Sequence, residues 1–182
     1  AAAMGYAVPG TVIAVGVLIP FAWLDNTVDG WMRESFGIST GLLLSGTLVA
    51  LIFAYTVRFL SVSIQAVESG LAKIKPSMDD AGRSLGLRPM GVLRRIHLPI
   101  MKGTVLTALL LVFVDVLKEL PATLILRPFN FNTLAVRAYE MAADERLADA
   151  GAPALMIVLA GIIPVILLSR AISRARAGGE TR

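Results

Sequence analysis

The chain has 182 residues, of which 56% are hydrophobic and 16% are charged, and its formal net charge is +4. This composition, with a mean hydropathy of +0.75, excludes an ordinary soluble domain and indicates a membrane protein. The absence of cysteine excludes disulfides and thiolate metal sites, and no basic surface with interleaved aromatic residues supports binding of nucleic acid.

Four stretches of the sequence carry no charged residue. They are residues 1–24, 35–57, 103–114 and 150–169. About 20 helical residues cross a hydrocarbon core, so three stretches are long enough, and the stretch at 103–114 needs its charged continuation to residue 119. We therefore predict an all-α polytopic helical bundle. Its spans are expected at about residues 5–23, 39–58, 101–120 and 151–169.

The first span contains Pro9 and Pro20, which are tolerable in a membrane where neighbouring helices satisfy the freed backbone groups. Trp23 and Trp31 flank its outer end, where indole side chains commonly anchor a helix at the interface. The chain begins at Ala1 without Met. We expect this span to lie inside a longer protein rather than to be a secretory signal.

Lysine and arginine are unevenly distributed between the connections. Residues 58–102 contain eight of them and the basic tail at 170–182 adds four, whereas the connections after the first and third spans lean acidic. Short loops rich in lysine and arginine stay cytoplasmic. We predict that residues 58–102 and both ends of this chain are cytoplasmic.

The cytoplasmic segment begins as a continuation of the second helix, with apolar residues at helical spacing as far as Pro76. Ser77 followed by Asp80 is typical of a capping box that starts a short helix, and Gly86 suits a left-handed position at its end. Pro89 suits the first turn of a second short helix over residues 90–98.

Pro99 then marks the return of the chain to the membrane. A protrusion of two helices joined by glycine, with apolar and charged faces outside the bilayer, suits docking to a cytosolic partner. The alternative is a well-capped, solvated loop. His97, the only histidine, is expected to face solvent or a partner, because no other His or Cys could complete a soft metal site with it.

The third span ends in a charged cluster formed by Asp115, Lys118 and Glu119, followed by Pro121. Each charge facing lipid at the bilayer centre costs roughly 2.5 to 3.5 kcal/mol, so the three must face protein, water or the interface. One interpretation places them beside a translocation path, near a gate at Pro121, where the carboxylates of Asp115 and Glu119 could transiently hold a hard cation. The other is an ion pair that fixes helix packing, with Glu119 extending outward. Neither establishes a firm metal site.

The outer connection after this cluster has two features. Arg127, Asn130 and Asn132 lie in a loop where a substrate-binding protein could dock, although a solvated turn explains each residue singly. Residues 134–149 form an amphipathic stretch that is expected to lie on the bundle or on the membrane surface.

The cytoplasmic loop resembles the signature of the membrane subunits of type I ATP-binding-cassette (ABC) importers. That signature runs Glu-Ala-Ala, three residues, Gly, nine residues, Ile, one residue, Leu-Pro. This chain keeps every interval, with Asp80-Ala81-Gly82, Gly86, Ile96 and Leu98-Pro99. It departs from the signature at Asp80, which keeps the carboxylate, and at Gly82, which keeps the small size but weakens a helix by up to ~1 kcal/mol. The resemblance implies that residues 77–99 are the coupling helix that fits a cleft on an ATPase subunit.

The resemblance extends over nearly the whole chain. Residues 5–20 and 117–145 are similar to the C-terminal half of ferric-iron importer permeases, which carry two such modules in one polypeptide. It implies that residues 1–182 are the C-terminal portion of an ABC transmembrane type-1 domain in a bacterial inner membrane. The implied partners are cytoplasmic ATPase subunits, a periplasmic substrate-binding protein and the other permease module. Related permeases for thiamine, polyamines, sulfate and phosphonates share this architecture.

The sequence has no GxxxxGK[ST] phosphate loop, so ATP and Mg are expected on the partner subunit, and this chain is expected to bind no cofactor and to catalyse no reaction. Two other classes of function stay open. One is an ion-coupled carrier or channel in which Asp115 and Glu119 handle protons or cations. The other is a membrane scaffold whose cytoplasmic loop recruits a soluble protein.

Overall fold

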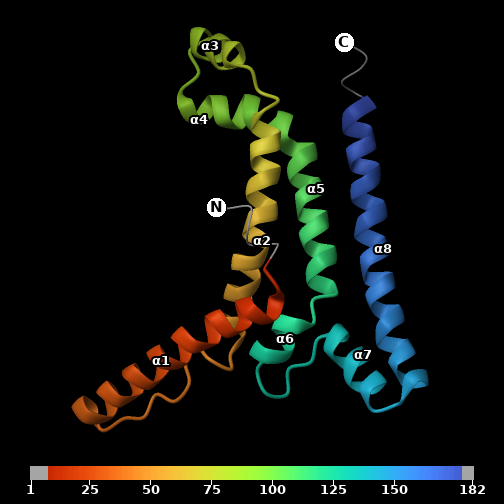
Figure 1. Cartoon of the computed structure of the whole chain (residues 1–182). Coiled ribbons are helices and arrows are strands. Elements are labelled where there is room, and N and C mark those ends of the chain that lie inside the picture. The colour runs from red at the N-terminus through yellow and green to blue at the C-terminus, as the bar shows by residue number, and fades with distance from the viewer. Residues whose placement is uncertain (1–7, 178–182) are drawn as a thin grey trace. The chain divides into compact units, whose positions relative to one another are not determined.

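A computed structural model describes residues 8–177, with side chains as far as residue 170 (Figure 1). The described residues form helices and contain no strand. The helices are α1 (Gly10–Phe36), α2 (Leu48–Leu71), α3 (Pro76–Ser84), α4 (Pro89–Val92), the π-helical turn η2 (Leu93–His97), α5 (Leu98–Leu117), α6 (Pro121–Leu126), α7 (Leu134–Ala143) and α8 (Leu147–Ala177). Four helical segments are long and apolar enough to cross a membrane. The predicted all-α membrane fold is confirmed.

The chain divides into two compact units. Unit 1 comprises Ala1–Ser61 and Asp115–Ala160, and unit 2 comprises Val62–Val114 and Gly161–Arg182. The first residues of the predicted span at 5–23 and the end of the basic tail at 170–182 fall outside the described residues. Unit 1 contains the charged cluster, and unit 2 contains the whole loop at 77–99.

Helix α1 extends through the acidic region that the sequence suggested was a loop. Asp25, Asp29 and Arg33 follow one another at intervals of four residues and so lie on one side of the helix. Asp29 pairs with Arg33 at 2.7 Å and also accepts hydrogen bonds from the backbone N–H groups of Thr40 and Gly41, at 2.7 and 3.1 Å. The predicted boundary at residue 23 is therefore too early.

The segment at 37–47 returns alongside α1 and is held there by a buried carboxylate (Figure 1). Asp25 is 2% exposed and accepts hydrogen bonds from the backbone N–H groups of Leu43, Leu44 and Ser45 at 3.1, 2.9 and 2.7 Å. The Ser45 hydroxyl donates to the same carboxylate at 2.6 Å. This segment is consequently not helical, and α2 begins at Leu48 rather than near residue 39.

The core of unit 1 is formed by α1, α2 and α6. Small residues, including Ala14, Ala50 and Ala122, are almost fully buried there and allow the helices to approach closely. Ile13, Leu51 and Leu126 fill the space between them. This packing fixes the start of α6 against α1, and it thereby positions the charged residues that precede α6.

The helix does not end between the loop at 77–99 and α5. The chain is helical without interruption from Pro89 to Leu117, and Pro99 lies in the first turn of α5. A proline inside a helix lacks the N–H group and clashes with the carbonyl four residues earlier. The widened π-helical turn at 93–97 lies directly before it and accommodates this defect. Figure 1 shows α4 lying across the end of α5 at this turn.

The amphipathic stretch at 134–149 is not one helix. It is divided into α7 and the start of α8 by a turn at Asp144 and Glu145, and Glu145 has a left-handed φ of 62°. The N–H groups of Glu145 and Arg146 donate to the carbonyls of Ala142 and Met141 at 3.1 and 2.9 Å, which ends α7.

Candidate functional site

The loop at 77–99 is built around a glycine turn. Gly86 has a φ of 79°, as predicted for a left-handed position. Its N–H donates to the carbonyl of Arg83 at 2.9 Å, and the N–H of Leu87 donates to the carbonyl of Gly82 at 3.0 Å. These two bonds satisfy the carbonyl groups at the end of α3, in the pattern of a Schellman motif.

Two distant positions of the importer signature are in contact. Gly82 is buried, and a Cβ atom placed on it would lie 2.8 Å from Cδ1 of Ile96 and 3.4 Å from Cγ2 of Val92. A larger residue at position 82 would have to displace the Ile96 side chain. The small size of Gly82 therefore has a physical role that its helix propensity does not reveal, since it lets α3 pack directly on Ile96.

A polar contact joins the same two elements. His97 Nε2 lies 2.7 Å from Asp79 Oδ1, and the two side chains are 19% and 29% exposed. The expectation that His97 faces only solvent or a partner is wrong, because its ring is engaged within the loop. The contact ties α3 to η2 next to the apolar packing of Gly82 on Ile96.

The helix start differs from the predicted capping box at Ser77. Helix α3 begins at Pro76, and the residue before it, Lys75, has no side-chain acceptor that could cap the helix. Proline is favoured at this first position because its fixed φ suits a helix and its missing N–H would have been unpaired. Because Pro76 is the first residue of α3, Ser77 lies inside the first turn and is not the N-cap residue.

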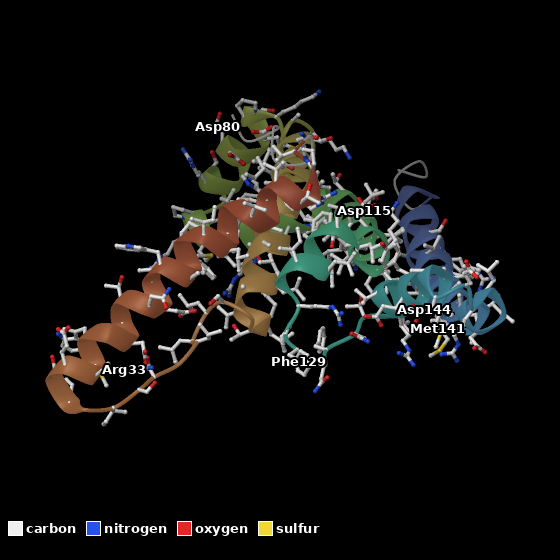
Figure 2. All side chains as sticks on the ribbon, turned by 60° about the horizontal axis from the view of Figure 1, so that its bottom comes forward. Arg33, Asp80, Asp115, Phe129, Met141 and Asp144 are labelled. Carbon is white, nitrogen blue, oxygen red and sulfur yellow. The ribbon has the colours of Figure 1, made fainter. Side chains whose placement is uncertain are left out.

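The remaining signature residues point outward. Asp80 and Ala81 are exposed on α3 (Figure 2), and Leu98 and Pro99 are exposed at the start of α5. Leu85 and Met90 beside them are 83% and 58% exposed. The loop thus has an internal face that holds its shape and an external face of apolar and charged side chains that another protein could contact.

In unit 1, Glu119 is the buried centre of the charged cluster. It is 5% exposed, and its carboxylate accepts hydrogen bonds from the N–H groups of Ala122 and Thr123 at 3.1 and 3.0 Å and from the Thr123 hydroxyl at 2.7 Å. Pro121, which lies between Glu119 and Ala122 in the sequence, is the first residue of α6. Glu119 therefore caps α6 from within the protein, and the expected outward extension of its side chain is wrong.

Arg58 is a member of this cluster that sequence reasoning missed. Its Nη1 atom lies 3.9 Å from Glu119 Oε1, and its side chain is 20% exposed. The Nε and Nη1 atoms are buried and have no hydrogen-bond partner among the described residues. The sequence did contain a signal for this pair. Arg58 and Glu119 lie at the ends of the predicted second and third spans, where each charge needed a partner.

Gly10 explains how these charges fit beneath α1. A Cβ atom on Gly10 would collide with Arg58 Nη1 and would lie 2.9 Å from Glu119 Oε1. Only a residue without a side chain permits this approach. The start of α1 therefore covers the contact between Arg58 and Glu119.

Asp115 and Lys118 lie on the accessible side of the cluster. They form an ion pair at 3.1 Å, in which the lysine side chain is 66% exposed and the aspartate 18%. Together with Arg58, Glu119 and Pro121 they line a cavity of about 220 Å³. The structure thus brings the predicted residues Asp115, Lys118, Glu119 and Pro121 to one place.

The donors of this cluster do not fit a resident metal site. Glu119 is engaged by the start of α6, and Asp115 faces the ammonium group of Lys118. Within residues 8–170, no group of three or more His, Cys, Asp or Glu side chains is arranged to hold a metal ion. The cavity carries two positive and two negative side chains, an arrangement suited to holding helices together or to brief contact with a passing ion.

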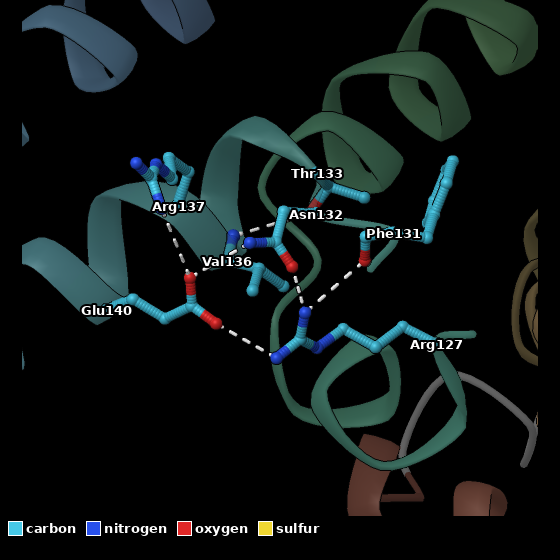
Figure 3. A network of polar contacts seen from close by, with 7 residues as sticks. All are labelled: Arg127, Phe131, Asn132, Thr133, Val136, Arg137 and Glu140. Atoms are coloured by element: carbon cyan, nitrogen blue, oxygen red, sulfur yellow. Dashed lines mark hydrogen bonds and ion pairs between the residues drawn. The ribbon is translucent and has the colours of Figure 1, made fainter. Parts of the chain in front are cut away.

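The loop at 127–133, which was expected to be a solvated turn on the outer side, is held by a network of polar contacts (Figure 3). Arg127 pairs with Glu140 at 2.9 Å and also donates to the Asn132 side chain. Asn132 Nδ2 donates to the other oxygen of Glu140 at 3.0 Å. This network ties the loop to α7.

The backbone of the same loop has two further features. The Thr133 hydroxyl accepts a hydrogen bond from Val136 N at 3.3 Å and caps α7, and Asn130 adopts a left-handed φ of 65°. Phe129 projects from the tip of the loop and is 94% exposed (Figure 2). The loop is thus a supported element that presents one large aromatic side chain.

Known proteins resemble this chain over most of its length. An Fe(3+)-transport system permease protein of Haemophilus influenzae, FbpB 2, is 32% identical over 165 residues, which are 91% of this chain and 29% of that protein. A protein of Salmonella typhimurium, PhnV, provisionally named as a 2-aminoethylphosphonate transport system permease protein, is 25% identical over 168 residues, which are 92% of this chain and 57% of that protein. The chain therefore spans less than two thirds of the length of these relatives.

A family-level match agrees with the four candidate spans. Residues 2–177 match the family described as "Binding-protein-dependent transport system inner membrane component", whose members are permease subunits of ABC importers. A multi-pass protein of the inner membrane is consistent with the four long apolar helices. The chain belongs to this family of importer permeases.

Proposed function

We propose that this chain is the C-terminal module of a ferric-iron importer permease that works with a separate ATPase. The observation that carries the proposal is the construction of the loop at 77–99. Its internal contact between Gly82 and Ile96 fixes its shape, while Asp80 and its apolar neighbours remain exposed for a partner. In this proposal the loop lies in the cytoplasm, as its positive charge suggests.

The helical connections of the loop support a mechanical role. Helix α4 continues through η2 into α5 without a break. A displacement of α4 by a closing ATPase would therefore be passed along a continuous helix toward the membrane, instead of being absorbed by a flexible linker. A coupled rigid movement of this kind is a common means of switching a membrane bundle between inward- and outward-open states.

Charge reversal at the exposed face tests the coupling assignment. In the full-length permease reconstituted with its ATPase, Asp80→Arg should leave assembly in the membrane intact and abolish ATP-driven uptake. Glu68→Arg, on α2 outside the loop, is a matched charge reversal that should leave coupling intact. Normal ATP-driven uptake by Asp80→Arg would contradict the proposal, and unchanged uptake without ATP would favour a carrier or channel.

Ferric iron is the cargo that we propose. It is supported by the 32% identity to the iron permease of Haemophilus influenzae, against 25% to the phosphonate permease. The phosphonate relative makes 2-aminoethylphosphonate the second candidate. Uptake of radiolabelled iron, 2-aminoethylphosphonate, thiamine, polyamines and sulfate should be compared in cells with and without the full gene, and loss of iron uptake alone is the expected result.

The cluster in unit 1 has two roles in this proposal. Arg58, Glu119 and the start of α6 form a fixed support, because the Glu119 carboxylate is used up by backbone and ionic contacts. Asp115 and Lys118 border the cavity and are the side chains that a passing ion would meet. The outer loop with Phe129 is the surface that we propose for the periplasmic binding protein.

A further inference from the structure

Unit 2 contains a basic cavity of mixed polar and apolar lining, in which the charged residues of the described lining are two lysines. It has a volume of about 540 Å³ and lies between the end of α2 and the start of α5, which run side by side there (Figure 1). Lys73 and Lys102 line it together with the polar side chains of Gln65, Ser69 and Thr104. None of its described lining residues is Asp or Glu. The cavity is therefore complementary to an oxyanion.

The walls of this cavity are held by direct contacts between the two helices. Lys73 Nζ donates to the Thr104 hydroxyl at 2.8 Å. Gly70 and Met101 are buried, and a Cβ atom on Gly70 would lie 3.1 Å from Cγ of Met101. This close approach fixes the spacing of the helices beside the polar groups, so the cavity does not depend on a loop for its shape.

An apolar groove adjoins the basic cavity. It has a volume of about 480 Å³ and is lined by Leu98, Val105 and Leu106, together with Pro99 and Lys102. Pro99 and Lys102 line both hollows. Lys102 thus borders both the basic cavity and the apolar groove, on a helix that is long and apolar enough to cross a membrane.

From this pairing we infer that the start of α5 binds an anionic glycerophospholipid. The headgroup phosphate lies in the basic cavity near Lys73 and Lys102, with the hydroxyls of Ser69 and Thr104 as further donors. An acyl chain lies in the groove formed by Leu98, Val105 and Leu106. Basic pockets between membrane helices on the cytoplasmic side are suited to anionic headgroups, and the adjoining groove favours a lipid over a free anion because a small anion would leave it empty.

This site is independent of the transported cargo. It lies in unit 2 with the coupling loop, and η2 leads directly into the helix that carries Lys102. A lipid bound there would fill the space between the ends of α2 and α5. It would thereby support the two helices from which the loop projects.

The binding test uses the full-length permease and lipids that differ only in headgroup. Native mass spectrometry would measure retention of phosphatidylglycerol and phosphatidylcholine with identical acyl chains. Lysine near an anionic surface contributes about 1 kcal/mol, so Lys102→Gln should weaken phosphatidylglycerol binding about fivefold and Lys73→Gln with Lys102→Gln about 30-fold. Lys75→Gln removes one charge from the same segment outside the cavity and should have little effect.

Further outcomes decide between occupants. Inorganic phosphate in excess should not displace phosphatidylglycerol, and displacement would identify a small-anion site and overturn the lipid assignment. Equal retention of the two lipids, or equal retention of phosphatidylglycerol by the wild type and the double variant, would also overturn it. Far-UV circular dichroism establishes that each variant is folded. Thr104→Val is a second kind of variant, which removes a hydroxyl group from the cavity without changing its charge.

Discussion

At the residue scale, the most informative side chain is Glu119. Substitution of a carboxylate in the transport pathway should lower uptake alone, whereas substitution of a structural carboxylate should also lower stability. Its oxygens are occupied by two backbone N–H groups, a hydroxyl and Arg58. In Glu119→Gln, an amide NH₂ group would replace one carboxylate oxygen and would face a hydrogen-bond donor that it cannot accept from. About 1 to 3 kcal/mol of stability should be lost for each donor left unpaired. Membrane abundance and thermal stability should therefore fall together with uptake.

Asp115→Asn is the matched variant for this prediction. Asp115 lies on the accessible side of the same cavity, so its substitution should lower uptake more than abundance. A Glu119→Gln protein with wild-type abundance and thermal stability but reduced uptake would contradict the structural role and return Glu119 to the pathway.

A second prediction at this scale concerns Gly86. Its φ of 79° is unfavourable for any residue with a Cβ atom, so Gly86→Ala should cost about 1 kcal/mol and loosen the end of α3. Gly91→Ala is the control, since a Cβ atom there meets Leu87 only at an ordinary 3.5 Å. Thermal unfolding of the two variants in detergent measures the difference, and an equal effect of both would argue against strain at Gly86.

At the element scale, the long helix α1 depends on the segment at 37–47 that returns along it. Asp25→Ala removes the acceptor for three backbone N–H groups and one hydroxyl. Buried donors without acceptors are costly, and we expect a loss of about 3 kcal/mol. Hydrogen exchange at residues 43–45 should rise sharply. Asp29→Ala, with a more exposed carboxylate, should have a smaller effect, and unchanged exchange in Asp25→Ala would show that packing alone holds the segment.

The turn between α7 and α8 provides a stabilising prediction. Glu145 adopts a left-handed φ of 62° without being glycine. Glu145→Gly should therefore stabilise the turn, by up to about 1 kcal/mol, because glycine has no Cβ penalty in this conformation. A rise in the thermal midpoint of the full-length protein is the expected measurement. A fall would mean that the Glu145 side chain makes a contact of greater value than the relieved strain.

The elements also show which features of the fold were predictable. Uncharged runs identified the membrane-spanning helices, because a helix in lipid must be apolar over its length. The predicted helix boundaries were wrong where charged side chains are paired with a segment that the sequence did not place beside them. Asp25 and Asp29 suggested a loop, whereas the returning segment at 37–47 satisfies both inside a continuous helix. Pro99 suggested a break, whereas a π-helical turn absorbs its missing N–H.

The site was predictable to a similar extent. The spacing of Gly82, Gly86 and Ile96 identified the loop, but the direct packing of Gly82 on Ile96 is a tertiary contact that spacing alone does not give. The pairing of Arg58 with Glu119 was missed for the same reason, since the two residues belong to different helical segments. Side chains far apart in sequence can be paired only when the fold is known.

At the scale of the whole molecule, the loop at 77–99 leads directly into a helix that is long and apolar enough to cross a membrane, and we propose that the loop drives the movement of that helix. The loop is stabilised internally by a glycine turn, an apolar contact and the Asp79–His97 pair, and it continues as a helix into α5. The chain itself covers 29% of the iron permease that it resembles. The transport that we propose therefore belongs to a full-length permease acting with an ATPase and a binding protein, and it must be tested on that assembly.

Iron accumulation in proteoliposomes tests the central claim most directly. The full-length permease would be reconstituted with its ATPase and its iron-loaded binding protein, and internal radiolabelled iron would be measured with ATP and with a non-hydrolysable analogue. We predict that iron accumulates only with hydrolysable ATP and that Asp80→Arg abolishes this accumulation. Iron entry driven by an ion gradient without ATP, or ATP-driven entry of 2-aminoethylphosphonate in place of iron, would contradict the account.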